Sequence, residues 1–533
     1  MATTTSELER FISDFERRMA PLERAVHEAW WNLATSGTDE AQEEFVRAGK
    51  EYNGLFSEQN EYLTLRSWYE NLEVLESPLL KRQVEVLYRT FAERQGDEEI
   101  LGRIEELEAE ANAVYGNHRS LVRDREMGEN EVRELLRTSA DQDLRQETWE
   151  ASKSVGRAVE ETVRELARLR NRMAREEGYA NHYARSLELQ EIKAGDLSRI
   201  MGSLESATDA PFRELKSDID TKLGLEFGVD AVMPWHLSGL FFQRATDIAG
   251  IDLDRYFEEE DLEDLTCRTF DALGLDVRGV ISSSDLYERE GKNQHAFCAR
   301  LGREYPYDVR VLANVRPDAY WMDAMLHEFG HAVYDRHVNP RLPYLLRTYA
   351  HANTTEAIAL MMGALVDDPG WLRSVVGANR ERLDQDSGKL AAHRRADKMI
   401  LTRFVLVMYH FEQALYTDPD SPALNSVWWD LFERLLFVDR PPGRDEPDWA
   451  AVIHVAVAPV YYHNYMLGEL ISAQLRNYLE SHITQGPFYQ NEVAGRYLLE
   501  SFFGPGAREN WPDTVLRATG EPLNPEYFVK SLG

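Results

Sequence analysis

The chain has 533 residues, 43% of them hydrophobic and 29% charged, which excludes a disordered chain and leaves room for one large body or about two to three ordinary domains. Its 93 acidic and 60 basic residues give a formal net charge of −33, which argues against nucleic acid as a partner. Two cysteines, Cys267 and Cys298, exclude a disulfide scaffold and a metal site built from cysteines.

The sequence carries no signal for a membrane. No run of about 18 apolar residues occurs anywhere in the chain. Residues 1–11 are polar and acidic and lack the apolar stretch of a secretory signal. We therefore expect no membrane span and a cytoplasmic location.

The N-terminal half has the pattern of helices. Apolar residues recur every three or four positions over 6–35, and Thr38 is expected to cap a second helix that ends near residue 58. Further helices are predicted over 60–95 with a break at Ser77-Pro78, from Asp97 to about Tyr115, over 141–178 and over 195–224.

The C-terminal half is also predicted to be helical, apart from one region of strands. Residues 294–299 and 307–312 are short and suited to strands, and they lie in the only segment, 293–315, where we predict any. Helices are expected over 317–337, 354–366, 395–417, 423–437 and 461–482. Because no internal repeat and no linker is visible, the chain is predicted to be all-α, one large and mostly helical body with a small sheet.

The segment that carries chemistry is His327-Glu328-Phe329-Gly330-His331. Residues four apart lie on one face of a helix, so His327 and His331 can offer two imidazoles to one metal ion. Glu328 lies beside them, within reach of a water molecule on that ion. This arrangement is the ligand pair and general base of a zinc peptidase helix. The alternative is a pair of histidines on a surface helix that binds no metal.

A catalytic zinc site needs a third protein ligand and one open position. His337 follows His331 by six residues and would point away from the ligand face. Glu356 is the better candidate, in the first turn of a helix that Asn353 or the neighbouring threonines can cap. A break at Pro340 and Pro343 would let this helix pack on the first one with Glu356 toward the histidines. The alternative for Glu356 is an acid favoured by the helix dipole.

Zinc in such a site polarises the scissile carbonyl and makes a bound water more acidic, while Glu328 moves the proton from this water to the leaving amine. The reaction also needs a donor for the oxyanion. Candidates lie in the tyrosine- and histidine-rich stretch 453–465. Aromatic residues at this density are also typical of a core.

Several segments of the chain resemble the angiotensin-converting enzyme (peptidyl-dipeptidase A) family of zinc peptidases. The segments are His327 to His331, Leu342 to Arg347, Glu356 to Ile358, Trp30 to Thr35, Trp149 to Tyr179, His295 to Cys298, and His454 with Tyr462 and Tyr465. The related family of oligoendopeptidase F and thimet oligopeptidase is the second candidate, since it also has a tyrosine-rich segment that ends in glycine, as Tyr461 to Gly468 does here.

This resemblance implies an architecture. It implies an all-α ellipsoid split by a deep central cleft, with one zinc ion per chain at its floor and a small sheet near the zinc. Residues 1–533 would form a single peptidase domain of two intertwined helical halves. Residues 1–95 would be lid-like helices that admit short peptides, and residues 290–470 would hold the zinc and the substrate.

The resemblance also implies roles for individual residues. Zinc would be bound by His327, His331 and Glu356, and Glu328 would be the general base. Tyr465 would stabilise the oxyanion. The substrate would be contacted by His454, His295, Ala296, Cys298, Tyr462 and Gln243, of which Ala296 and Cys298 would pair with the main chain of an extended peptide.

Three positions depart from the family pattern. Val452 stands where a lysine grips the terminal carboxylate of the substrate, and Asn464 stands where an arginine binds chloride. Leu360 replaces an aspartate that supports a zinc ligand, and Asp323 and Asp335, four residues before His327 and four after His331, are the candidates for this role. The first two departures count against strict release of C-terminal dipeptides and against activation by chloride. From the resemblance as a whole, we predict a zinc peptidase of short peptides with a peptidyl-dipeptidase or carboxypeptidase mode. The alternatives are an oligoendopeptidase and a zinc-binding homologue that binds peptides without cutting them.

Overall fold

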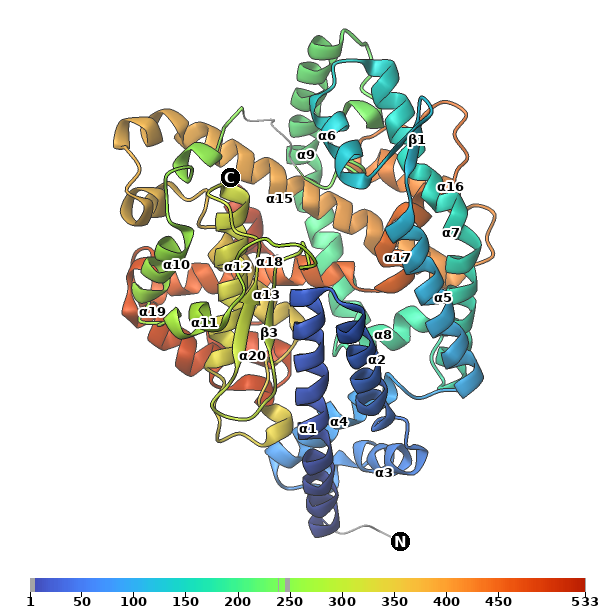
Figure 1. Cartoon of the computed structure of the whole chain (residues 1–533), viewed down its shortest axis with the longest axis vertical. Coiled ribbons are helices and arrows are strands. Elements are labelled where there is room, and N and C mark those ends of the chain that lie inside the picture. Colours follow the sequence, from blue (N-terminus) through green and yellow to red (C-terminus); the bar gives the residue numbers. More distant parts are fainter. Residues whose placement is uncertain (1–4, 238, 245–249, 533) are drawn as a thin grey trace. The chain divides into compact units, whose positions relative to one another are not determined.

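The computed structural model describes residues 5–237, 239–244 and 250–532 (Figure 1). Helices make up most of the described chain, and its strands form two antiparallel sheets of two strands each. The predicted all-α fold with a small sheet is thereby confirmed. None of the helices in the described ranges is long and apolar enough to cross a membrane.

The chain divides into two compact units, and each is discontinuous in sequence. The first unit consists of Met1–Gln95, Asp252–Ser387 and Leu467–Tyr527, and the second of Gly96–Ile251, Gly388–Met466 and Phe528–Gly533. The N-terminal helices expected to form a lid therefore belong to the first unit. The segment 290–470, expected to form the core of the site, is shared by both.

The first unit contains a helical N-terminal segment and the larger of the two sheets. Its strands are β3 (Phe297–Arg300) and β4 (Val309–Leu312). Its α-helices are α1 (Thr5–Ser36), α2 (Asp39–Gly54), α3 (Gln59–Tyr69), α4 (Pro78–Ala92), α10 (Leu262–Asp271), α11 (Arg278–Ser283), α12 (Ala319–Arg336), α13 (Ala352–Gly363), α14 (Pro369–Trp371), α19 (Glu492–Leu498) and α20 (Trp511–Thr519). Short 3₁₀ and π turns are η1 (Leu72–Val74), η3 (Asp254–Tyr256), η4 (Tyr344–Leu346), η5 (Leu372–Val376), η8 (Leu479–Ile483), η9 (Phe488–Gln490), η10 (Leu499–Phe503) and η11 (Gly506–Arg508).

The second unit is built around long helices. Its elements are α5 (Glu98–Asn117), β1 (Ser120–Val122), β2 (Arg125–Met127), α6 (Glu129–Thr138), α7 (Gln142–Glu176), α8 (His182–Leu189), α9 (Ala194–Phe227), η2 (Pro234–His236), α16 (Leu424–Leu431), η6 (Phe432–Leu436), η7 (Asp448–Ala451) and α17 (Ile453–Val457). Three helices run from one unit into the other, namely α15 (Arg380–Thr417), α18 (Tyr462–Tyr478) and α21 (Glu526–Ser531).

Side-chain caps explain why several helices begin where the sequence predicts. Thr38 accepts a hydrogen bond from the backbone N–H of Ala41 at 3.3 Å, and Ser77 accepts one from Leu80 at 3.3 Å. Asp97 and Asp141 cap α5 and α7 in the same way. Each cap satisfies a backbone donor that a helix N-terminus leaves without an intrahelical partner.

The structure corrects three sequence predictions. The segment 293–315 is not the only one with strands, because β1 and β2 form a hairpin whose turn residues Arg123 and Asp124 have positive φ. Helix α15 begins at Arg380 rather than 395, since the polar residues of its first turns hide the apolar period. Helix α13 begins at Ala352, and its N-cap is His351 rather than Asn353. Thr354 completes the cap by accepting a hydrogen bond from the backbone N–H of His351 at 3.2 Å, and Glu356 lies beyond the first turn.

The sheet of the first unit lies against the helix that carries the histidine motif. Strands β3 and β4 pair antiparallel, with Phe297 opposite Leu312 and Arg300 opposite Val309, and both contact α12. Phe297 also packs against Trp30 and Trp31 of α1, within a cluster of buried side chains. In this unit the sheet therefore packs against both α1 and α12.

Candidate metal centre

Helices α12 and α13 build the site, and local capping fixes where each begins. Asp318, nine residues before His327, is the N-cap of α12 and accepts a hydrogen bond from the backbone N–H of Trp321 at 2.8 Å. The side chain of His351 accepts from the N–H of Asn353 at 3.1 Å and starts α13. In Figure 1 the two helices are neighbours in the first unit, in contact along their length.

Gly330 allows these two helices to pack unusually closely. A Cβ atom at this position would lie 2.8 Å from Cα of Ala359 and 3.1 Å from its nitrogen. Real Cβ atoms do not approach other atoms so closely, so only glycine fits here. The close packing brings the side chains on the facing surfaces of α12 and α13 within reach of one another.

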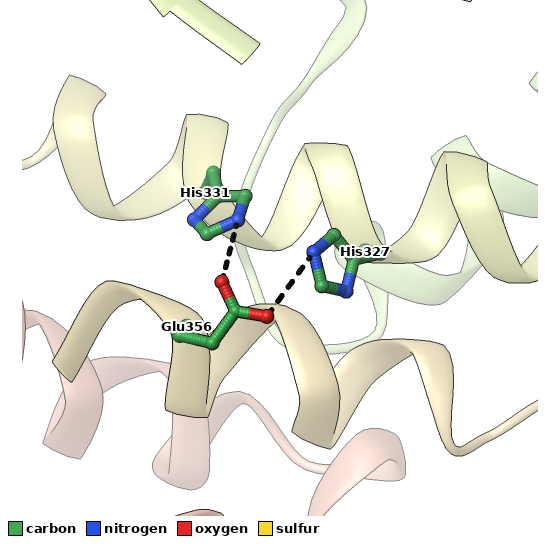
Figure 2. Close-up of side chains that lie close together, drawn as sticks. All are labelled: His327, His331 and Glu356. Atoms are coloured by element: carbon green, nitrogen blue, oxygen red, sulfur yellow. Dashed lines mark ion pairs between the residues drawn. The ribbon is translucent and has the colours of Figure 1, made fainter. Parts of the chain in front are cut away.

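The structure brings the three predicted ligands together (Figure 2). Nε2 of His327 lies 3.7 Å from Oε1 of Glu356, and Nε2 of His331 lies 3.7 Å from Oε2. The three donor atoms all lie within 4.8 Å of one another. Ligands at about 2.1 Å from a tetrahedral zinc ion are about 3.4 Å apart, so two imidazoles and a carboxylate at these distances fit zinc.

The protonation states of the histidines suit a metal. Burial lowers the pKa of His327 to about 4, and burial together with the charge of His327 lowers the pKa of His331 to about 3. Both imidazoles are therefore neutral at physiological pH, and a ligand imidazole must be neutral.

The pKa values of the two carboxyl groups are raised rather than lowered. Burial, with a contribution from Glu469, raises the pKa of Glu356 to about 7. Burial and the charge of Glu356 raise the pKa of Glu328 to about 8. A dication between these groups favours their ionised forms, because opposite charges within about 4–6 Å stabilise each other.

Glu328 is hydrogen-bonded to the sheet. It is 9% exposed, on the same helix as both histidines. A hydrogen bond from the backbone of Cys298 in β3 lowers its pKa, against the larger effect of burial. The base candidate and the strand expected to bind substrate are thus in contact.

Thr355 supports one of the histidines. Its hydroxyl lies 2.7 Å from Nδ1 of His331, so it fixes the orientation of the ring whose Nε2 faces Glu356. Asp335, one of two aspartates expected in this role, instead pairs with Arg300 of β3 at 3.2 Å. His337 contacts the carbonyl of Val333 at 2.8 Å, away from the ligands, as predicted.

Helix α18 covers Glu356 from another side. A Cβ atom on Gly468 would lie 3.1 Å from Cγ of Glu356 and 3.2 Å from Cδ1 of Leu360. Glu469 follows and adds negative charge near Glu356. The sequence predictions missed the roles of Thr355, Gly330 and Gly468. A glycine inside a helical pattern was the signal for the last two.

Of the predicted substrate contacts in the first unit, two precede the strand and one lies in it. His295 is exposed and Ala296 is half-buried, both directly before β3. Cys298 belongs to β3, and burial raises the pKa of its thiol, which stays protonated.

The other predicted residues gather in the second unit. The ring of His454 lies 4.8 Å from that of Tyr462 and 6.4 Å from that of Tyr465, and the two tyrosine rings are 5.6 Å apart. Tyr462 is hydrogen-bonded to Gln243. Burial raises the pKa of Tyr462, and this hydrogen bond opposes the increase. These four residues from three segments of sequence therefore form one cluster.

Comparison with known proteins agrees with the geometry. The sequence pattern of the family described as angiotensin-converting enzyme matches residues 2–215, and that of peptidase family M3 matches residues 135–533. Angiotensin-converting enzyme of Oryctolagus cuniculus is 22% identical over an alignment of 576 positions, and that of Mesocricetus auratus is 23% identical over 577. Each alignment covers 98% of this chain and 42% of the relative, so the chain spans less than half the length of these relatives. Both resemblances inferred from the motifs are thereby confirmed, and the chain belongs to peptidase family M3.

Proposed function

We propose that this chain is a zinc-dependent metallopeptidase that hydrolyses peptide bonds of short peptides. The observation that carries the proposal is the cluster of His327, His331 and Glu356, with Glu328 on the same helix. One zinc ion per chain fits this donor set. Membership of a peptidase family supports the same conclusion.

Metal binding and proton transfer are assigned to different residues of the chain. His327, His331 and Glu356 would hold the zinc ion, which when bound supplies a Lewis acid that polarises the scissile carbonyl and activates water. Glu328 removes a proton from the attacking water and delivers it to the leaving amine. Its hydrogen bond from Cys298 orients the carboxylate toward the strand where the peptide would lie.

An extended peptide has a strand edge to bind. Within the described residues β3 pairs with β4 alone, so a peptide would add along its other edge, beside Ala296 and Cys298. The backbone of Cys298 already donates to Glu328 on this edge, so an added peptide would lie next to the general base. Contacts from His295, His454, Tyr462 and Gln243, and an oxyanion contact from Tyr465, are predictions that rest on the resemblance.

The mode of cutting depends on recognition of the peptide's C-terminus. Val452, at the place of the family's lysine, is 3% exposed and apolar, so it offers no charge to a carboxylate. This observation favours an oligopeptidase that cuts without a charged anchor. The similarity to angiotensin-converting enzymes favours a peptidyl-dipeptidase.

Zinc analysis and one substitution test the proposal. Purified protein is expected to contain one zinc per chain, and Glu328→Gln is expected to keep the zinc while losing at least about 100-fold in peptide hydrolysis, the scale of general-base catalysis. Glu381→Gln, an exposed residue of α15, is the matched control and should cut normally. Protein without zinc, or a Glu328→Gln enzyme of normal activity, would refute the proposal. Peptide binding without turnover would indicate the non-catalytic alternative.

A second experiment separates the two modes. A peptide and its C-terminal amide are compared as substrates, with mass spectrometry of the products. A large loss of rate on amidation and release of dipeptides would indicate the peptidyl-dipeptidase mode. Equal rates and internal cleavage would indicate an oligopeptidase. The cytoplasmic location stays a prediction, which cell fractionation tests.

A further inference from the structure

The backbone of Val460, directly before α18, has an unusual conformation. Its φ is +55°, in the left-handed region. A β-branched residue is strained there, so neighbouring structure must hold it in place. Helix α18 begins two residues later and carries Tyr462 and Tyr465.

Two side chains from other segments, the buried Glu412 and the half-buried Gln190, hold this turn. Oε1 of Glu412, from α15, accepts a hydrogen bond from the N–H of Val460 at 2.6 Å, and Glu412 is 2% exposed. The amide nitrogen of Gln190 donates to the carbonyl oxygen of Val460 at 3.1 Å. The oxygen of the same Gln190 amide accepts from the side chain of Asn464 at 2.7 Å. Both backbone groups of the strained residue, and the first turn of α18, are therefore tied to side chains from other segments.

The chain before the turn is fixed in the same manner. The hydroxyl of Tyr115 donates to the carbonyl oxygen of Ala450 at 2.6 Å, and Nη2 of Arg170 donates to that of Ala456 at 2.6 Å. The first contact holds η7, and the second holds α17, which carries His454. The turn at Val460 thus joins a fixed segment to the helix of the tyrosines, and all these residues belong to the second unit.

A change at this joint would move the tyrosines. If Val460 relaxed to negative φ, the direction of the chain into α18 would rotate, and the hydroxyl groups at the ends of the long tyrosine side chains would move farther than the backbone. A displacement of about 1 Å at a reacting group is enough to lower a rate by roughly 100-fold.

We propose that Glu412 and Gln190 are positioning residues, which hold the left-handed turn at Val460 and thereby orient Tyr462 and Tyr465 for the reaction. The inference rests on the proposed peptidase function. Neither residue belongs to the predicted contacts of substrate or metal, and both act through the backbone of Val460.

The protonation state of Glu412 guides the choice of variants. Burial raises the pKa of Glu412 to about 8, against the opposing effects of the Val460 hydrogen bond and the charge of Arg170. The side chain is therefore mainly an uncharged carboxylic acid at neutral pH. Glutamine has the same shape and an oxygen that accepts the same bond, so Glu412→Gln conserves the contact.

The experiment measures kcat and KM of the zinc-loaded enzyme, with rates normalised to folded, zinc-containing protein. Glu412→Ala is expected to lower kcat at least about tenfold with little change in zinc content, since no zinc ligand is altered. Glu412→Gln should retain kcat within about twofold. Adding Val460→Gly to Glu412→Ala should restore much of the loss, because glycine adopts positive φ without strain. Thr402→Val is the control on the same helix, where the lost hydroxyl bonds only within α15.

The outcomes distinguish this inference from the proposed function. An inactive wild-type enzyme defeats the proposed function. An active wild type with normal kcat per folded Glu412→Ala molecule overturns the inference, since a merely structural role changes only the folded fraction. If Glu412→Ala fails to fold, Gln190→Met removes the other bond and should lower kcat about threefold or more by the same displacement of the tyrosines. Normal kcat in Gln190→Met would then overturn the inference.

Discussion

Gly330→Ala is the most informative change at the metal centre. It adds one methyl group to α12, two residues after Glu328 and directly before His331. The new Cβ would lie 2.8 Å from Cα of Ala359, while ordinary contacts begin at 3.4 Å, so α12 and α13 must separate by 0.6 Å. Metal sites tolerate errors of about 0.2 Å in ligand distances. The substitution should therefore move Glu356 away from the histidines by more than zinc tolerates.

The same change should alter the free energy of unfolding much less. Overpacking lowers the free energy of unfolding by about 1–3 kcal/mol, and replacing glycine by alanine inside a helix raises it by about 1 kcal/mol. We expect a net loss of about 0–2 kcal/mol in the absence of metal, together with at least a tenfold weaker affinity for zinc.

Two measurements check this prediction. Competition with a chromogenic chelator gives the zinc affinity, and denaturant unfolding of the metal-free protein gives the stability. Gly49→Ala in α2 is the control, because its Cβ would meet nothing within 4 Å. It should gain up to about 1 kcal/mol and bind zinc normally. If Gly330→Ala folds and binds zinc as tightly as the wild type, the spacing of α12 and α13 does not set the site.

Three other changes have defined outcomes. Thr355→Val removes the hydroxyl that contacts Nδ1 of His331 and should weaken zinc binding by about 10-fold in the chelator assay, whereas unchanged binding would show that the ring is oriented by other contacts. The folded-state pKa of Glu412 is raised from 4.5 to about 8, so its contribution to stability is complete below pH 4.5 and is lost as pH rises through 8. Glu412→Gln should therefore gain stability over the wild type between these pH values, by about 1.4 kcal/mol per pH unit at most, and a difference independent of pH in urea unfolding would contradict this. Glu23→Ala removes a buried carboxylate that pairs with the half-buried Arg303 at 2.9 Å, and should lower the free energy of unfolding by about 3–5 kcal/mol. A loss below about 1 kcal/mol would show that water replaces the carboxylate.

Local rules predicted much of the fold from the sequence. Thr38, Ser77, Asp97 and Asp141 cap helices where expected, because a cap depends on residues within one turn. The hairpin at 120–127 was missed because two strands of three residues have too few positions to show an alternating pattern.

The ligand set was predictable for a related reason. The spacing of His327 and His331 follows from the helical period, and Glu356 follows from the need for a third ligand on the next helix. The N-cap residue of that helix was not predicted, because His351 acts as the acceptor there, a role that depends on its tautomer and surroundings. The predicted part of the threonines is confirmed for Thr354, which accepts from the backbone N–H of His351.

Contacts between distant segments could not be predicted. Gly468 approaches Glu356 across more than one hundred residues of sequence, and Gln190 binds Val460 across a still longer separation. No local pattern encodes such pairs, because packing in three dimensions selects them.

The position of Gly468 in the chain also bears on synthesis. Glu356 leaves the ribosome more than one hundred residues before Gly468 of α18, which covers it in the finished protein. At about 5–20 residues per second, the ligand helices exist for several seconds without that cover. Zinc bound by α12 and α13 during this interval would enter before α18 covers Glu356, by a more open path than in the finished protein.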